Sequence, residues 1–174
     1  MRTLILGGVR SGKSRHAEEL AAKAGGAVAV IVTATAADDA EMAARIAAHR
    51  AHRPASWRVI EEPLALGRAL RAAARPGAVV IIDCLTLWLT NILLQGDAGL
   101  LQRESNALIE SVRSAQGPLI LVSNEVGSGI VPVNALARRF TDVTGSLHQR
   151  LAQVCDQVVW MVAGLPLTVK GTRP

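Results

Sequence analysis

Residues 7–14 of the chain read Gly-Gly-Val-Arg-Ser-Gly-Lys-Ser, which fits the pattern G-x-x-x-x-G-K-[ST]. The apolar residues 4–6 come directly before this motif, and residues 14–24 have the composition of a helix. A strand, a glycine-rich loop and a helix in this order place backbone N–H groups and a helix N-terminus around phosphate oxygens. In such a loop Lys13 would reach the β- and γ-phosphates, and the Ser14 hydroxyl would bind Mg²⁺. The motif therefore predicts a P-loop that binds a nucleoside triphosphate.

Length and composition favour one α/β domain over residues 1–174. A chain of this length can bury a sizeable core, and 50% hydrophobic against 19% charged residues argues against extensive disorder. The longest apolar run, at residues 78–82, is too short to cross a bilayer, and the first strand begins too early for a signal peptide. We therefore expect a soluble, cytoplasmic protein without a membrane span.

The formal net charge is +5, but the arginines are spread along the chain rather than clustered. This pattern predicts no nucleic-acid partner and suits a protein that binds a triphosphate and an anionic product. Cys84 and Cys155 are isolated and lack zinc-ligand spacing, so we expect two ordinary thiols in a reducing compartment.

Strand and helix signals alternate along the chain. Apolar and β-branched runs predict strands at residues 3–6, 27–33, 57–60, 78–82, 119–123 and, as the final strand, 157–162. Helical periodicity predicts helices at residues 14–24, 38–52, 63–75, 85–94, 100–115 and 134–151. Alternating units of this kind imply a mainly parallel sheet flanked by helices, with ligands at the carboxyl ends of the strands.

Two segments at that edge carry polar side chains. Asp83 ends an apolar strand, where a P-loop protein places the carboxylate that holds the Mg²⁺ shell, although a helix cap is the alternative. Residues 124–129 read Asn-Glu-Val-Gly-Ser-Gly, and Glu125 would project toward the same edge unless the segment is a plain surface turn. The N-K-x-D motif for guanine is missing, so the spacing does not identify the base.

His49 is a candidate nucleophile. It shares one predicted helix face with Arg45 and His52, at spacing i, i+4, i+7. A neutral imidazole can attack phosphorus, and nearby guanidiniums would stabilise the charge that develops. A solvated or structural histidine is the alternative, and we expect a structural role for His16 and His148.

Four blocks of sequence together resemble one protein family. They read Gly-Gly-x-Arg-Ser-Gly-Lys-Ser-Arg-His-Ala-Glu, Asp-Asp-x-Glu-Met-x-x-Arg-Ile-x-x-His, Arg-Pro-x-x-Trp and Asn-Glu-Val-Gly-x-Gly-Ile-Val-Pro. In this order and spacing, the chain resembles the bifunctional adenosylcobinamide kinase/adenosylcobinamide-phosphate guanylyltransferase family of cobalamin biosynthesis. The resemblance implies a RecA-like, three-layer P-loop fold, and family members assemble as trimers, so we expect a homotrimer.

The resemblance implies two reactions. The first phosphorylates the aminopropanol hydroxyl of adenosylcobinamide with ATP or GTP. The second transfers GMP from GTP, through a GMP–histidine intermediate, to adenosylcobinamide phosphate, which gives adenosylcobinamide-GDP and pyrophosphate. The histidine of the intermediate matches His49, and Lys13 is the second expected catalytic residue. The alternatives are a small-molecule P-loop kinase without guanylyl transfer, and a nucleotide-binding switch or assembly ATPase.

The resemblance also implies the nucleotide contacts, with Mg²⁺ bound at Ser14 and Asp83. The expected contacts are Gly7, Gly8, Val9, Arg10, Ser11, Gly12, Lys13, Ser14, Ala34, Thr35, Ala36, Arg50, Ala51, His52, Arg53, Glu61 and Asp83. Two positions depart from some relatives. Asp83 stands where these have Glu, and Ala48 precedes His49 where these have a second His.

Overall fold

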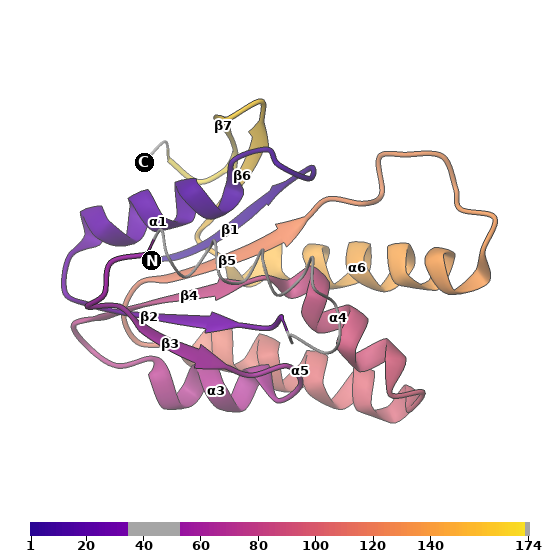
Figure 1. The fold of residues 1–174 in the computed structure, drawn as a ribbon, viewed down its shortest axis with the longest axis horizontal. Helices are drawn as coiled ribbons and strands as arrows, with labels where there is room; N and C mark the ends of the chain where they lie inside the picture. Colours follow the sequence, from indigo (N-terminus) through magenta and orange to yellow (C-terminus); the bar gives the residue numbers. More distant parts are fainter. Residues whose placement is uncertain (35–52, 173–174) are drawn as a thin grey trace.

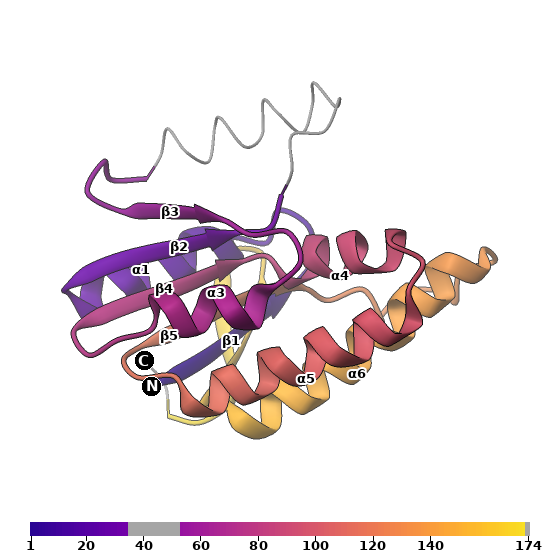
Figure 2. The ribbon, with the colours of Figure 1, turned by 90° about the horizontal axis from the view of Figure 1, so that it is seen from below.

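The computed structural model describes residues 1–34 and 53–172, and in this part a seven-stranded sheet has one helix on one face and four on the other (Figure 1; Figure 2). The strands are β1 (Arg2–Gly7), β2 (Ala27–Val32), β3 (Arg58–Glu61), β4 (Ala78–Asp83), β5 (Leu119–Asn124), β6 (Gln157–Val162) and β7 (Leu165–Lys170). The helices are α1 (Lys13–Ala24), α3 (Leu66–Ala73), α4 (Leu85–Leu94), α5 (Ala98–Ser114) and α6 (Ala135–Val154). All six predicted strands are present, and the predicted helix at 38–52 lies outside the described residues.

The strand order is β3-β2-β4-β5-β1-β6-β7, and every pair is parallel except β6 with β7. β5 lies between β1, which leads into the P-loop motif, and β4, which ends in Asp83. Gly7 pairs with Asn124, and Asp83 pairs with Val122. The parallel arrangement therefore brings the P-loop, Asp83 and the end of β5 to one edge of the sheet, as predicted.

The prediction that residues 157–162 form the final strand was wrong. β7 follows as an antiparallel edge strand, and most of its side chains are exposed. The segment contains Pro166, and proline within sheets is found mainly on edge strands because it lacks the N–H that a central ladder needs. An exposed strand with a proline gives no buried apolar run, which is the signal that identified the other strands.

Helix α3 begins three residues later than predicted from the position of Pro63. The Glu62 carboxylate accepts hydrogen bonds from the N–H groups of Leu64 (3.0 Å) and Ala65 (2.8 Å), so a separate turn precedes the helix at Leu66. These bonds, with an ion pair to Arg68, lower the pKa of Glu62 although burial of the carboxyl opposes them. Propensity alone did not reveal this side-chain cap.

The two faces of the sheet carry separate cores. Ala17 and Ala21 of α1 pack on one face, and the larger core under α3, α4, α5 and α6 includes the fully buried Trp88, whose Nε1 donates to the Leu64 carbonyl at 2.7 Å. Both cysteines are free thiols, as predicted. Among the helices of the described ranges, none combines the length and apolar character that a bilayer requires.

Helices α3 and α5 approach so closely at Gly67 that a side chain does not fit. A Cβ atom at Gly67 would lie 2.7 Å from the carbonyl carbon and oxygen of Ala107. Because both atoms are backbone, Gly67→Ala must separate the helices, and we expect it to lower the free energy of unfolding by roughly 2 kcal/mol. Gly145→Ala in α6 is the control, because its Cβ would meet no described atom within 4 Å. It should raise stability by roughly 0.5–1 kcal/mol. Urea unfolding measures both, and equal shifts would contradict the proposed close contact.

Candidate nucleotide-binding site

The loop between β1 and α1 has the backbone geometry of a phosphate cradle. Gly7, Arg10 and Gly12 have positive φ angles of 152°, 55° and 93°. A Cβ at Gly7 would lie 2.6 Å from the Met161 carbonyl oxygen, so glycine is required there. No described side chain caps the N-terminus of α1. The helix N–H groups at this end can therefore bind an anion.

Lys13 lies inside this loop and is only 7% exposed. Its Nζ donates to the Gly8 carbonyl oxygen at 2.5 Å and to Ser11 Oγ at 3.5 Å. Burial lowers the pKa of Lys13, and the neighbouring Cys84 and Asp83 oppose this shift. The ammonium group thus bridges the start and the middle of the loop, where phosphate oxygens would replace its present acceptors.

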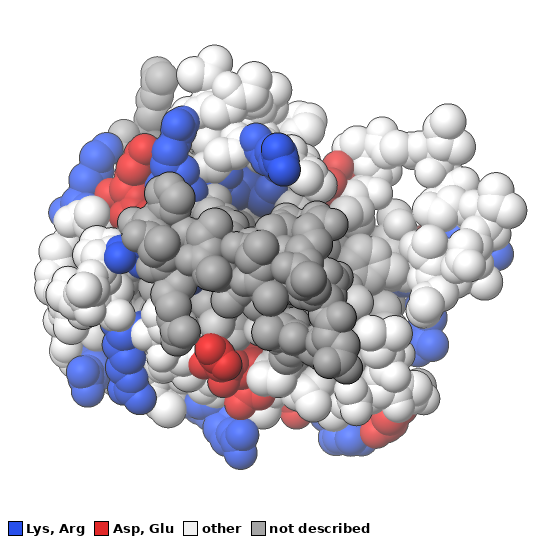
Figure 3. All heavy atoms as spheres, viewed as in Figure 1, with Lys and Arg blue, Asp and Glu red and all other residues white. Residues whose placement is uncertain are grey.

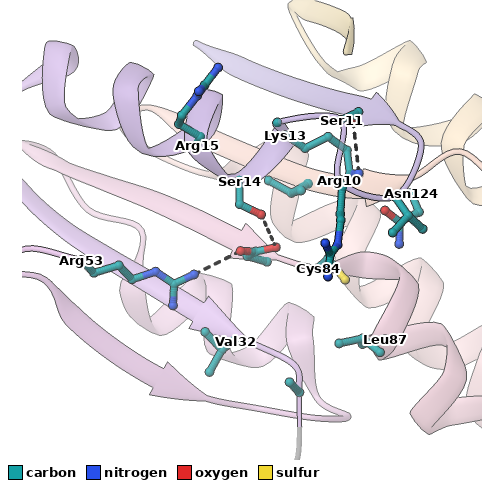
Figure 4. A pocket seen from close by; sticks show the side chains of 15 residues that line it. Arg10, Ser11, Lys13, Ser14, Arg15, Val32, Arg53, Cys84, Leu87 and Asn124 are labelled. Atoms are coloured by element: carbon teal, nitrogen blue, oxygen red, sulfur yellow. Dashed lines mark hydrogen bonds and ion pairs between the residues drawn. The ribbon is translucent and has the colours of Figure 1, made fainter. Parts of the chain in front are cut away.

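Asp83, at the end of β4, faces the start of α1. Ser14 Oγ donates to Asp83 Oδ1 at 3.4 Å, and this hydrogen bond is the dashed line from Ser14 in Figure 4. The N-cap residue of α4 is Cys84, and no described side chain caps this helix, so the helix-cap alternative for Asp83 is excluded. A carboxylate and a hydroxyl are oxygen ligands of the kind that Mg²⁺ prefers, and the pair fits the predicted metal site.

Arg53 binds two carboxylates at once. Its Nε donates to Glu18 Oε1 and its Nη2 to Asp83 Oδ2, both at 3.1 Å, and its side chain is 7% exposed. The second of these contacts is the dashed line from Arg53 in Figure 4. Charge-assisted contacts of this kind are strong and directional, so they tie the chain at Arg53 to α1 and β4. Glu18 was not among the predicted site residues, although it ends the first of the four sequence blocks. Its spacing of four residues from Ser14 places both on one face of α1, and this spacing was a further signal.

These side chains line a cavity of about 530 Å³, which lies in the size range of small-molecule sites. The predicted residues that line it are Val9, Arg10, Ser11, Gly12, Lys13, Ser14, Ala34, Arg53 and Asp83. The cavity lining also contains residues that were not predicted, namely Arg15, Val32, Cys84, Leu87, Val122 and Asn124. Sequence reasoning placed strand ends at this edge but could not tell which apolar side chains would face the cavity.

The remaining predicted contacts differ in their placement. Gly7 and Gly8 belong to the loop but do not line the cavity, and Glu61 is exposed at the end of β3, outside the lining. The predicted residues Thr35, Ala36, His49, Arg50, Ala51 and His52 lie outside the described residues. On the face shown in Figure 3, Lys and Arg side chains form several separate groups, in agreement with the dispersed arginines of the sequence.

The fold and the cavity define a P-loop nucleotide-binding protein. The solved structure of the RadB recombinase has a TM-score of 0.52 to the chain at 17% identity, and covers 91% of this chain and 72% of that one. This likeness shows the fold alone, which is RecA-like as predicted.

Sequence comparison gives the family. The family model described as cobinamide kinase / cobinamide phosphate guanyltransferase matches residues 3–169. The chain is 56% identical over 171 residues to the bifunctional adenosylcobalamin biosynthesis protein CobP of Pseudomonas aeruginosa, covering 98% of each. It is 39% identical over 183 residues to the protein CobU of Escherichia coli K12, covering 98% of this chain and 100% of that protein. The chain belongs to the cobinamide kinase / cobinamide phosphate guanyltransferase family.

Proposed function

We propose that this chain catalyses both reactions of its family. It phosphorylates adenosylcobinamide with ATP or GTP, and it then transfers GMP from GTP to adenosylcobinamide phosphate through a GMP–histidine intermediate on His49. The observation that carries the proposal is the cavity in which the P-loop, Lys13 and the Ser14–Asp83 pair meet. The family match over nearly the whole chain extends this from nucleotide binding to the two reactions.

The kinase step needs little covalent chemistry from the protein. The loop N–H groups and the α1 N-terminus bind the phosphates, and the Lys13 ammonium stabilises negative charge on the β- and γ-phosphates. Ser14 and Asp83 would hold Mg²⁺, which neutralises phosphate charge when bound. The acceptor hydroxyl oxygen attacks the γ-phosphorus, the bond to the β-phosphate oxygen breaks, and the hydroxyl proton leaves to solvent.

The guanylyl transfer attacks a different phosphorus. The His49 imidazole forms a P–N bond to the α-phosphorus, and the bond to the pyrophosphate oxygen breaks. An oxygen of adenosylcobinamide phosphate then attacks the same phosphorus, and the P–N bond breaks. The covalent intermediate divides the exchange into two displacements, so pyrophosphate can leave before the second substrate reacts. Arg53, four residues after His49 in the sequence, lines the cavity and supports a role for this segment there.

Intact-protein mass measurement tests the proposal. Incubation with Mg²⁺ and GTP, without corrinoid, should add one GMP to the chain, and incubation with Mg²⁺ and ATP should add nothing. Kinase activity without a GMP adduct would instead support the alternative of a small-molecule P-loop kinase. A chain that shows neither the GMP adduct nor kinase activity would instead support the alternative of a nucleotide-binding switch or assembly ATPase.

Further parts of the proposal rest on the family resemblance. We propose the predicted nucleotide contacts and a homotrimer. Exposed apolar side chains at the connection from β5 to α6, which extends away from the sheet in Figure 1, support self-association. They are Ile130, Val131 and Val133 in the connection, and Leu136 at the start of α6. One domain over residues 1–174, a cytoplasmic location and the absence of a nucleic-acid partner stay predictions.

The Asp83→Asn variant tests whether Asp83 binds Mg²⁺ or serves only as the ion-pair partner of Arg53. We expect this variant to raise the Mg²⁺ concentration needed for half-maximal kinase activity and to lower turnover about tenfold or more, because the amide loses the charge that holds the metal. Glu18→Gln is the matched control, since it removes the other ion pair of Arg53 and leaves the Ser14–Asp83 pair. A Mg²⁺ titration of both measures this. If the two variants lose equal kinase turnover and show the same Mg²⁺ dependence, Asp83 acts only as the ion-pair partner of Arg53 and not as a metal ligand.

A further inference from the structure

The end of β5 is tied to the first residue of the P-loop. Asn124, the last residue of β5, pairs with Gly7 of β1, and the Glu125 N–H donates to the Gly7 carbonyl oxygen at 3.0 Å. Lys13 Nζ is bound to the next residue along the loop, Gly8. Asn124 and the Lys13 ammonium group are therefore both held beside the first two residues of the loop. In P-loop proteins the lysine contacts the β- and γ-phosphates.

The Asn124 carboxamide lines the cavity together with Lys13 and Asp83 (Figure 4). Within the described part of the chain, this carboxamide makes no hydrogen bond. An amide has two N–H donors and a carbonyl acceptor, so it carries donors that suit phosphate oxygens without adding a charge that repels them. The motif Asn-Glu-Val-Gly-Ser-Gly thus begins with a donor at the nucleotide cavity.

A buried polar network holds the backbone N–H group of Asn124 in place. Its N–H donates to Thr86 Oγ1 at 2.7 Å, and Thr86 Oγ1 lies 3.3 Å from Ser123 Oγ. Ser123 Oγ in turn lies 2.8 Å from His148 Nε2. The network joins α4, β5 and α6, and its three side chains are at most 9% exposed. Satisfied buried networks of this kind are rigid, because an unpaired member would be costly.

Glu125, the next residue, makes no hydrogen bond to this network within the described part of the chain, although its carboxylate attracts His148 electrostatically. Its two carboxylate oxygens accept the N–H groups of Gly127 (2.6 Å) and Ser128 (3.2 Å), and these bonds lower its pKa against the opposing effect of burial. The carboxylate therefore holds the turn after β5. This contrast makes Glu125 a suitable control for Asn124.

We propose that the Asn124 carboxamide donates to the terminal phosphate of a bound nucleoside triphosphate, and that His148 is a positioning residue that holds Asn124 through Ser123 and Thr86. The inference rests on the proposed function only for the binding of a triphosphate in the P-loop. It assigns a selectivity for triphosphate over diphosphate to the motif that follows β5.

Calorimetric titration with β,γ-imido-ATP and with ADP, each with Mg²⁺, tests the contact. Asn124→Ala should weaken the triphosphate analogue about tenfold and ADP less than about twofold, as expected for one lost hydrogen bond to a charged group. Asn124→Asp should weaken the analogue further, because it places a like charge beside the phosphate. Glu125→Gln should keep the wild-type preference. Equal losses for both nucleotides in the Asn124 variants would overturn the contact.

The His148 variants test the positioning. His148→Leu should reduce the preference for the analogue, and His148→Gln, whose amide nitrogen can replace Nε2 beside Ser123, should restore it. Lower thermal stability in both variants with an unchanged preference would overturn the positioning role. Neither probe carries GMP, so the result does not depend on adduct formation. A wild-type chain that binds neither nucleotide would overturn the proposed function together with this inference.

Discussion

Lys13→Ala is expected to abolish both the kinase and the guanylyl transfer. One P-loop cavity is proposed to hold the triphosphate in both reactions, and Lys13 is the buried cation within the loop. Losing a charge-assisted contact to the reacting phosphates costs about 3–4 kcal/mol of transition-state stabilisation, on the order of a hundredfold to a thousandfold in rate. The fold should persist, because the alanine removes a buried charge whose hydrogen bonds are confined to the loop itself.

The two rates are measured separately, by phosphorylation of adenosylcobinamide and by formation of the GMP adduct from GTP. Lys23→Ala is the matched control, because Lys23 is an exposed lysine in the last turn of the same helix. It should leave both rates within about twofold of wild type, as surface substitutions usually do. Guanylyl transfer at the wild-type rate in Lys13→Ala would show that the two reactions use separate nucleotide sites.

The core of the site could be predicted because its parts are local. The P-loop is one contiguous motif, and Asp83 is marked by its position at the end of an apolar strand. Parallel strands then bring both to one edge, whatever the detailed register. The contact of Ser14 with Asp83 therefore agrees with the mainly parallel sheet that the alternation of strands and helices indicated, although the strand order itself was not predicted.

Most of the missed parts depend on contacts between distant segments. Glu18 pairs with a residue 35 positions away. The cap by Glu62 is local, but it depends on the geometry of one turn, which propensity does not specify. The network from His148 to Ser123 spans 25 positions and joins residues whose local sequence indicates only a helix and a strand. His148 was expected to be structural, and the structure places it, buried, in this network, through which we propose that it positions Asn124.

The second large effect is expected for His49→Asn. This variant should form no GMP adduct and make no adenosylcobinamide-GDP, because asparagine lacks the nitrogen lone pair that attacks the α-phosphorus. Phosphorylation of adenosylcobinamide should persist, because the P-loop, Ser14 and Asp83 remain and the γ-transfer needs no imidazole nucleophile. The wild-type adduct should be labile in acid and stable in alkali, as a P–N bond is, unlike a serine or carboxylate ester.

Peptide mapping of the wild-type adduct decides which histidine carries GMP. His16→Gln is the control, since His16 lies on α1 with its Nδ1 3.9 Å from Glu19 Oε2, and its burial lowers its pKa. His16 is thus a second imidazole near the P-loop that could carry GMP in place of His49. His16→Gln removes it, and we expect this variant still to form the adduct. GMP mapped to His16, His52 or His148 would overturn the assignment. Loss of the kinase in His49→Asn would show instead that this segment serves both transfers, because γ-phosphoryl transfer would then require it as well.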